Sequence, residues 1–125
     1  DNRCGRYASM HLYSEAAWPL GLNLKMWAEY LREGCGLGEA YIIPMKAESL
    51  AGLPPAYIEA QECDILRDEA LTFGRLLTDA GTPAKTVLIS GSYHGFDEDF
   101  RNPFVRSAVG ARIAFFEGVM ADHGL

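Results

Sequence analysis

The sequence has 125 residues, of which 49% are hydrophobic and 22% are charged, so its composition is that of a folded chain rather than a disordered one. Its formal net charge is -6, and because an acidic chain repels phosphate, we expect no nucleic-acid partner. No apolar run approaches the length that crosses a bilayer, so we expect no membrane span. The first residue is Asp rather than Met, and we therefore expect the natural chain to start upstream of Asp1.

The three cysteines, Cys4, Cys35 and Cys63, are odd in number and far apart. A disulfide framework needs an even and denser set, and a zinc site needs closely spaced pairs of the C-x-x-C kind. We therefore predict reduced structural thiols, a cytoplasmic location and no metal.

Residues 1–52 are expected to form a helical and irregular segment. Glycine and proline interrupt any period in residues 1–22. Asn23 is predicted to cap a helix that ends at Gly34, and residues 36–52 are predicted to form a long connection. The inner stripe of that helix would consist of Leu24, Trp27 and Leu31.

Residues 53–125 are predicted to form a βαβα unit. Ala56–Ala60 is a β-prone run, and a helix is expected to start near Arg67 or Asp68 and to end at Gly81. Gly74 inside this helix indicates a close packing contact, because glycine weakens a helix. The apolar run Thr86–Ile89 is predicted to be a strand buried on both faces. A strand, a helix and a second strand in this order predict a parallel pair.

Asn102 and Pro103 predict the start of a last helix, with Asn102 as the cap and Pro103 in the first turn. Its apolar face would carry Val105, Ala108, Val109, Ile113, Phe116 and Met120. The predicted fold class is α/β, with residues 1–125 as one portion of a single domain. Because two parallel strands cannot form a stable sheet alone, we expect this domain to be larger than the chain.

Two chemistry-bearing residues follow the two predicted strands. Asp64 comes after the first strand and His94 after the second. The carboxyl ends of parallel strands meet at one edge of a sheet, where open α/β sheets place their functional residues. A carboxylate there can accept the Nδ1–H of an imidazole and prepare Nε2 as a general base. The alternative interpretation is an Asp that caps the following helix and a loop His in solvent.

Four short motifs occur in one order: Leu53-Pro54-Pro55-Ala56-Tyr57-Ile58, Cys63-Asp64-Ile65-Leu66-Arg67-Asp68-Glu69, Ala80-Gly81-Thr82-Pro83 and His94-Gly95-Phe96. The series resembles the C-terminal portion of α/β-hydrolases of the hormone-sensitive-lipase-like esterase family, of the arylacetamide-deacetylase type. The segments Asp1-Asn2-Arg3 and Met26–Leu31 extend the resemblance over nearly the whole chain. It implies a carboxylic-ester hydrolase that needs no cofactor and acts on a small-molecule ester, with Asp64 as the catalytic acid and His94 as the catalytic base of a Ser-Asp-His triad.

Two parts of the family's machinery have no counterpart in these 125 residues. No G-x-S-x-G motif occurs, so the nucleophilic serine is absent, and the H-G-G oxyanion loop is absent too. We expect both to lie upstream, and the chain alone to be a poor esterase or none, since each oxyanion donor is worth about 10²–10³ in rate. The alternative is an inactive fragment, or an interaction module that forms a homo-oligomer through an exposed strand edge.

Other candidate residues have simpler interpretations. Cys63 could be a nucleophile, but we expect a small buried residue at a strand end. Ser92 could contact the site, but we expect a turn hydroxyl. The run Asp97–Asp99 is predicted to be a solvated acidic turn rather than a metal loop. No role is predicted for His11 or His123. The aromatic residues predicted to serve as core and cover are Trp18, Trp27, Phe73 and Phe116.

Overall fold

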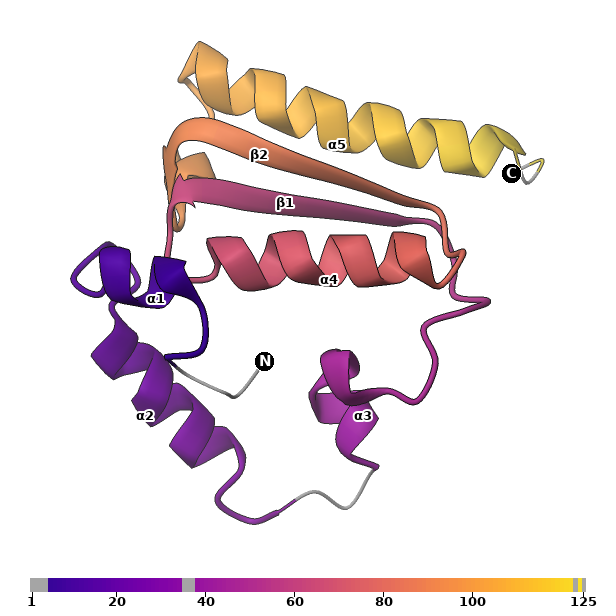
Figure 1. Cartoon of the computed structure of the whole chain (residues 1–125). Coiled ribbons are helices and arrows are strands. Elements are labelled where there is room, and N and C mark those ends of the chain that lie inside the picture. Colours follow the sequence, from indigo (N-terminus) through magenta and orange to yellow (C-terminus); the bar gives the residue numbers. More distant parts are fainter. Residues whose placement is uncertain (1–4, 35–37, 123, 125) are drawn as a thin grey trace. The chain divides into compact units, whose positions relative to one another are not determined.

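The computed structural model describes residues 5–34, 38–122 and 124, and it divides into two compact units, Asp1–His94 and Gly95–Leu125. The first contains α1 (Ala8–Leu12), α2 (Leu20–Tyr30), α3 (Glu39–Ile42), the 3₁₀ turn η1 (Pro44–Lys46), β1 (Ala56–Cys63), α4 (Arg67–Asp79) and β2 (Ala84–Tyr93) (Figure 1). The second contains η2 (Phe96–Glu98) and α5 (Pro103–Asp122).

Strands β1 and β2 pair in parallel, which confirms the predicted βαβ unit and the α/β fold class. The pairing starts at Ala56 with Ala84 and keeps one register as far as Gln61 with Ile89. Both strands continue past the runs predicted from the sequence, because polar residues such as Glu62 and Ser90 also take extended backbone there. In the described part of the chain, the sheet has these two strands.

Helix α4 starts and ends where the sequence predicts, and it runs alongside the sheet (Figure 1). It packs tightly against β2 at Gly74, where a Cβ atom would lie 2.1 Å from Oγ1 of Thr86. Real Cβ atoms do not come so close to another heavy atom, so only glycine fits at this position. The close packing predicted for Gly74 is therefore confirmed.

The N-terminal helix prediction is wrong in its starting point. Helix α2 begins at Leu20 after Pro19, and Asn23 lies inside it with 1% of its surface exposed. The Asn23 side chain accepts a hydrogen bond from Nε1 of Trp18, at 3.2 Å, instead of capping the helix. The segments predicted to be irregular also contain α1, α3 and η1, which are too short to show a period in the sequence.

The strand Thr86–Ile89 is not buried on both faces, contrary to the prediction, since 45% of Leu88 is exposed. Among the described residues the sheet has two strands, so each strand has one edge without a neighbouring strand. The buried residues of this unit instead come from several elements. Burying one large apolar side chain contributes about 1.5–3 kcal/mol to stability. The buried hydrophobic residues of the first unit are Met10, Ile43, Ala60, Ile65 and Leu77.

In the second unit, Asn102 and Pro103 start α5 as predicted. Oδ1 of Asn102 accepts a hydrogen bond from the backbone N–H of Phe104 at 3.0 Å, as a capping side chain does. Of the predicted apolar face, Val105 and Ala108 are buried, and three later members, Ile113, Phe116 and Met120, are exposed. Among the described residues, no helix is long and apolar enough to cross a membrane.

We expect a Gly74→Ala substitution to destabilise the protein by about 1–3 kcal/mol, because the added methyl group overlaps Thr86. The matched control is Gly21→Ala in α2, where a Cβ has open space. A double substitution that adds Thr86→Ala should recover part of the loss. Urea unfolding measures all three, and equal effects of Gly74→Ala and Gly21→Ala would contradict the packing argument.

Candidate active site

Asp64 and His94 are the residues that directly follow β1 and β2, and the structure brings them together. Nδ1 of His94 lies 2.8 Å from Oδ2 of Asp64. A carboxylate oxygen accepts hydrogen bonds, so the imidazole donates from Nδ1. Asp64 is 1% exposed, whereas 39% of the His94 side chain is exposed. The imidazole is therefore bonded to a buried carboxylate, while part of the ring remains exposed to solvent.

The position of His94 depends on an irregularity near the end of β2. Up to Gln61 and Ile89, paired residues differ by 28 in number, but Cys63 pairs with Tyr93, a difference of 30. Between these pairs, β1 has one residue and β2 has three. With the first register, Ser92 would lie opposite Asp64. The two extra residues place His94 there instead, and an even number leaves the alternation of faces unchanged.

The three residues of β2 between these pairs, residues 90–92, form a bulge, and this bulge makes its own hydrogen bonds. Gly91 has a φ of +73°, and its N–H donates to Oε2 of Glu62, at 2.6 Å, across the strand pair. The hydroxyl of Ser92 is buried and donates to the backbone oxygen of Ile89, at 2.6 Å. Ser92 therefore satisfies its hydroxyl within its own strand.

Asp64 also shapes the turn into α4. Its Oδ1 accepts the backbone N–H of Leu66 at 3.0 Å, and its backbone oxygen accepts the N–H of Arg67 at 3.2 Å. Side-chain bonds of this kind stabilise a turn two residues ahead. Asp64 is therefore not the cap of α4, whose N-cap is Leu66, but one of its carboxylate oxygens stabilises the turn before the helix and the other bonds His94.

A buried serine that the sequence analysis missed ties α1 to this turn. The backbone N–H of Ser9 donates to Oδ2 of Asp68 at 2.8 Å, and the N–H of Asp68 donates back to the Ser9 hydroxyl at 3.2 Å. The same hydroxyl donates to the backbone oxygen of Ile65 at 2.8 Å. These contacts join residues more than fifty positions apart, so no local sequence pattern shows them.

Arg67 makes further contacts at the same turn. Its guanidinium donates to Oδ1 of Asp68 at 2.8 Å and to the backbone oxygen of Glu62 at 3.1 Å, and it lies over the ring of Tyr13. Burial raises the pKa of Asp68, but the hydrogen bonds from Arg67 and Ser9 outweigh it and hold the pKa below its ordinary value. The bond to Asp68 raises the pKa of Arg67.

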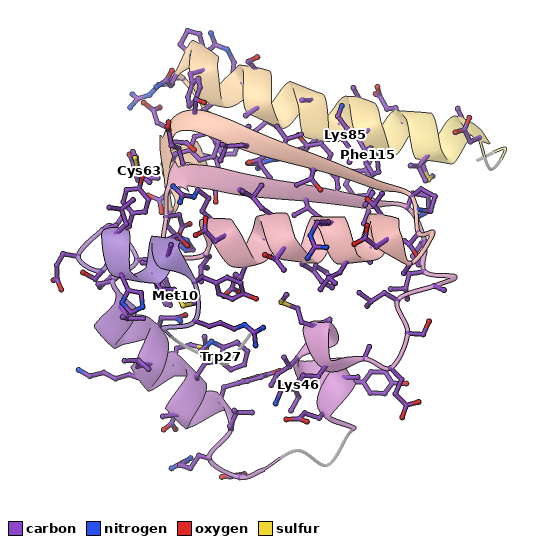
Figure 2. The ribbon with its side chains drawn as sticks, in the orientation of Figure 1. Met10, Trp27, Lys46, Cys63, Lys85 and Phe115 are labelled. Carbon is purple, nitrogen blue, oxygen red and sulfur yellow. The ribbon has the colours of Figure 1, made fainter. Side chains whose placement is uncertain are left out.

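The remaining candidates lie in different surroundings. His11 is exposed beside the backbone oxygen of Gly5, and Cys63, at the end of β1 in Figure 2, is a half-buried free thiol. Asp97 forms an ion pair with Arg112 at 2.6 Å. Across the part of the chain that the structure describes, no cluster of three or more His, Cys, Asp or Glu residues could hold a metal ion. Cys4, Cys35 and His123 lie outside the described residues.

Trp18 is the second residue whose place the sequence analysis missed. It was predicted to be core or cover, but its ring stacks on the imidazole of His94, with the ring centroids 5.3 Å apart and the planes at 25°. An isolated tryptophan in an irregular segment carries no pattern that predicts such a contact.

A family model described as alpha/beta hydrolase fold matches residues 5–98. The chain belongs to this family. Within this family, the chain belongs to the fold-3 branch of the α/β hydrolases, and this branch contains esterases and lipases. This confirms the resemblance found in the four sequence motifs.

Individual α/β hydrolases agree with this assignment. The Esterase LipI of Mycobacterium tuberculosis is 42% identical over 57 residues, which are 46% of this chain and 18% of that protein. The Arylesterase of Saccharolobus solfataricus is 31% identical over 78 residues, 62% of this chain and 24% of that protein. A solved bacterial heroin esterase superposes with a TM-score of 0.81 and 28% identity, over 95% of this chain and 39% of that one. The matches thus cover about a quarter or less of these curated relatives and about two-fifths of the solved structure.

The ion pair of Asp68 predicts a dependence of stability on pH. A carboxyl group whose pKa is lowered by folding stabilises the protein above its ordinary pKa of about 3.9, and this contribution is lost as the pH falls through the folded-state pKa. We therefore expect Asp68→Asn to lower the free energy of unfolding at about pH 7, and the difference from wild type to shrink towards about pH 3. Urea unfolding at both pH values measures this. The control is Asp79→Asn, which removes an exposed ion pair with Arg75. A wild-type advantage over Asp68→Asn that is the same at both pH values would contradict the prediction.

The bulge in β2 predicts that two glycine substitutions with similar effects on stability will differ in their effect on His94. Gly91→Ala places a side chain at positive φ, which costs about 1–2 kcal/mol, and so does the control Gly52→Ala, at a φ of +74° in open space. We expect similar losses of stability, but only Gly91→Ala should displace His94. The downfield proton resonance of His94 Nδ1–H reports this by NMR, and an unchanged resonance in Gly91→Ala would count against the role of the bulge.

Proposed function

We propose that this chain supplies the acid and the base of a Ser-Asp-His triad in a carboxylic-ester hydrolase. Asp64 is the acid and His94 is the base. The observation that carries the proposal is the 2.8 Å hydrogen bond from Nδ1 of His94 to the buried Asp64, at the carboxyl ends of two parallel strands. Membership of a family of esterases and lipases supports it.

The proposed chemistry follows from this arrangement. The serine hydroxyl attacks the carbonyl carbon of the ester, while Nε2 of His94 takes the hydroxyl proton. The imidazolium then gives that proton to the oxygen of the leaving alcohol, and a water molecule activated in the same way hydrolyses the acyl-enzyme. Asp64 holds the imidazole in the tautomer whose Nε2 is free to accept a proton, and its negative charge stabilises the imidazolium.

The serine and the oxyanion donors of this proposal come from sequence outside these 125 residues, since the chain contains no G-x-S-x-G and no H-G-G motif. The 125 residues alone are then inactive. Relatives such as Esterase LipI and Arylesterase support carboxylic esters as the substrate class. Self-association through a strand edge and a cytoplasmic location stay predictions.

The full-length protein tests the two roles. We expect His94→Ala to lower kcat for a short-chain nitrophenyl ester by about 10³–10⁶-fold and Asp64→Asn by about 10⁴-fold, as in other Ser-His-Asp enzymes. The control His11→Ala changes an exposed histidine outside the pair and should keep the rate. A His94→Ala protein with the wild-type rate would falsify the assignment of the base.

The coding sequence upstream of Asp1 gives an independent test. We expect an in-frame H-G-G motif followed by G-x-S-x-G, in that order and before the present first residue. If the reading frame contains neither motif, there is no nucleophile for His94 to activate, and the hydrolase proposal fails.

A further inference from the structure

The imidazole of His94 is in contact with a second group besides Asp64. The indole of Trp18 covers one face of the ring, with the centroids 5.3 Å apart and an interplanar angle of 25°. Trp18 lies in the segment between α1 and α2, far from His94 in the sequence. The stack therefore connects the N-terminal part of the unit to the end of β2.

The bond to Asp64 by itself does not determine where Nε2 points. One hydrogen bond holds the ring at Nδ1, and coupled rotations about χ1 and χ2 of His94 can still swing the ring while this bond is kept. Such a swing moves Nε2, the atom that must meet the serine hydroxyl. An aromatic face stacked on the imidazole blocks the swing on that side, because the ring would have to enter the indole.

The indole is itself anchored. Its Nε1–H donates to Oδ1 of Asn23 at 3.2 Å, and Asn23 is buried in α2. A buried amide with a hydrogen-bonded partner is costly to displace, so this contact opposes sliding of the indole in its own plane. The orientation of His94 is thus determined at the edge by Asp64 and at the face by Trp18, which α2 holds through Asn23.

We propose that Trp18, anchored by Asn23, is a positioning residue for the base His94. It keeps Nε2 aligned with the serine, and its π face stabilises the imidazolium that forms when His94 takes the serine proton. The proton moves from the serine oxygen to Nε2 and leaves again with the alcohol. This inference rests on the proposed function.

Steady-state kinetics of the full-length protein with a short-chain nitrophenyl ester test the proposal. We expect Trp18→Leu to lower kcat by about 10- to 100-fold, because small misplacements of a catalytic group have effects of this size. KM should stay within about threefold, because the stack acts on the base rather than on the bound ester. Trp18→Phe keeps an aromatic face and should recover most of kcat.

The matched control is Trp27→Leu, which removes a tryptophan of α2 (Figure 2). The Trp27 ring packs edge-on against Tyr30. This variant should leave kcat within about twofold of wild type, so it measures the effect of losing any tryptophan from this segment. Asn23→Leu removes the anchor but keeps the indole, and we expect a decrease in kcat between those of Trp18→Phe and Trp18→Leu.

A spectroscopic measurement reports the stack without any need for activity. The ring current of the indole shifts the carbon-bound ring protons of His94 upfield, and in Trp18→Leu these resonances should move downfield. In Trp18→Phe part of the shift should remain. This measurement also covers the case in which Trp18→Leu is too unstable for kinetics, because Trp18→Phe then carries the comparison.

The outcomes separate the positioning role from the proposed function. If Trp18→Leu loses no more kcat than Trp27→Leu, or if only KM rises, Trp18 is not a positioning residue. If the His94 resonances do not move in Trp18→Leu, the stack is absent in solution and the proposal fails for that reason. If His94→Ala keeps full activity, the proposed function fails first, whatever the resonances show.

Discussion

A buried carboxylate needs hydrogen-bond donors, and in this chain that need organises the surroundings of Asp64. An unpartnered polar group in a protein interior costs about 1–3 kcal/mol, and an unpaired charge costs more. Asp64 is buried and meets the requirement with the backbone N–H of Leu66 and with Nδ1 of His94. Leu66 directly precedes α4, and His94 directly follows β2. The helix and the two strands therefore come together at one carboxyl group.

The two extra residues in β2 show how the backbone serves this bond. In the regular register Ser92 would lie opposite Asp64, and a serine hydroxyl there could not act as a general base. The bulge moves His94 into that place, and Glu62 holds the bulge through the N–H of Gly91. Bulges beside active sites commonly re-aim a side chain in this way. The contacts of Ser9 with Asp68 and Ile65 hold the turn after β1, so α1 and the bulge in β2 both contribute to the surroundings of Asp64.

The βαβ unit could be predicted because its signals are local. Apolar β-prone runs, a helix with a 3.6-residue period and the turn glycine Gly81 each act within a few residues. The same is true of Asn102 and Pro103 at the start of α5. The N-terminal half was less predictable because its contacts are between distant residues. Asn23 has the residue type of a helix cap, but its side chain bonds the indole of Trp18, five residues earlier, and the helix starts at Leu20 instead.

The sequence by itself determined the identity of the paired residues, their places after two strands and the family to which the chain belongs. These follow from residue types and spacing, which carry over from one member of the family to another. Only the tertiary structure decided what surrounds His94 and Asp64: the bulge at Gly91, the turn that Ser9 contacts from more than fifty residues away, and the ring of Trp18 stacked on the imidazole. Such contacts arise from packing between segments, and packing geometry is not written in the local pattern of any one of them.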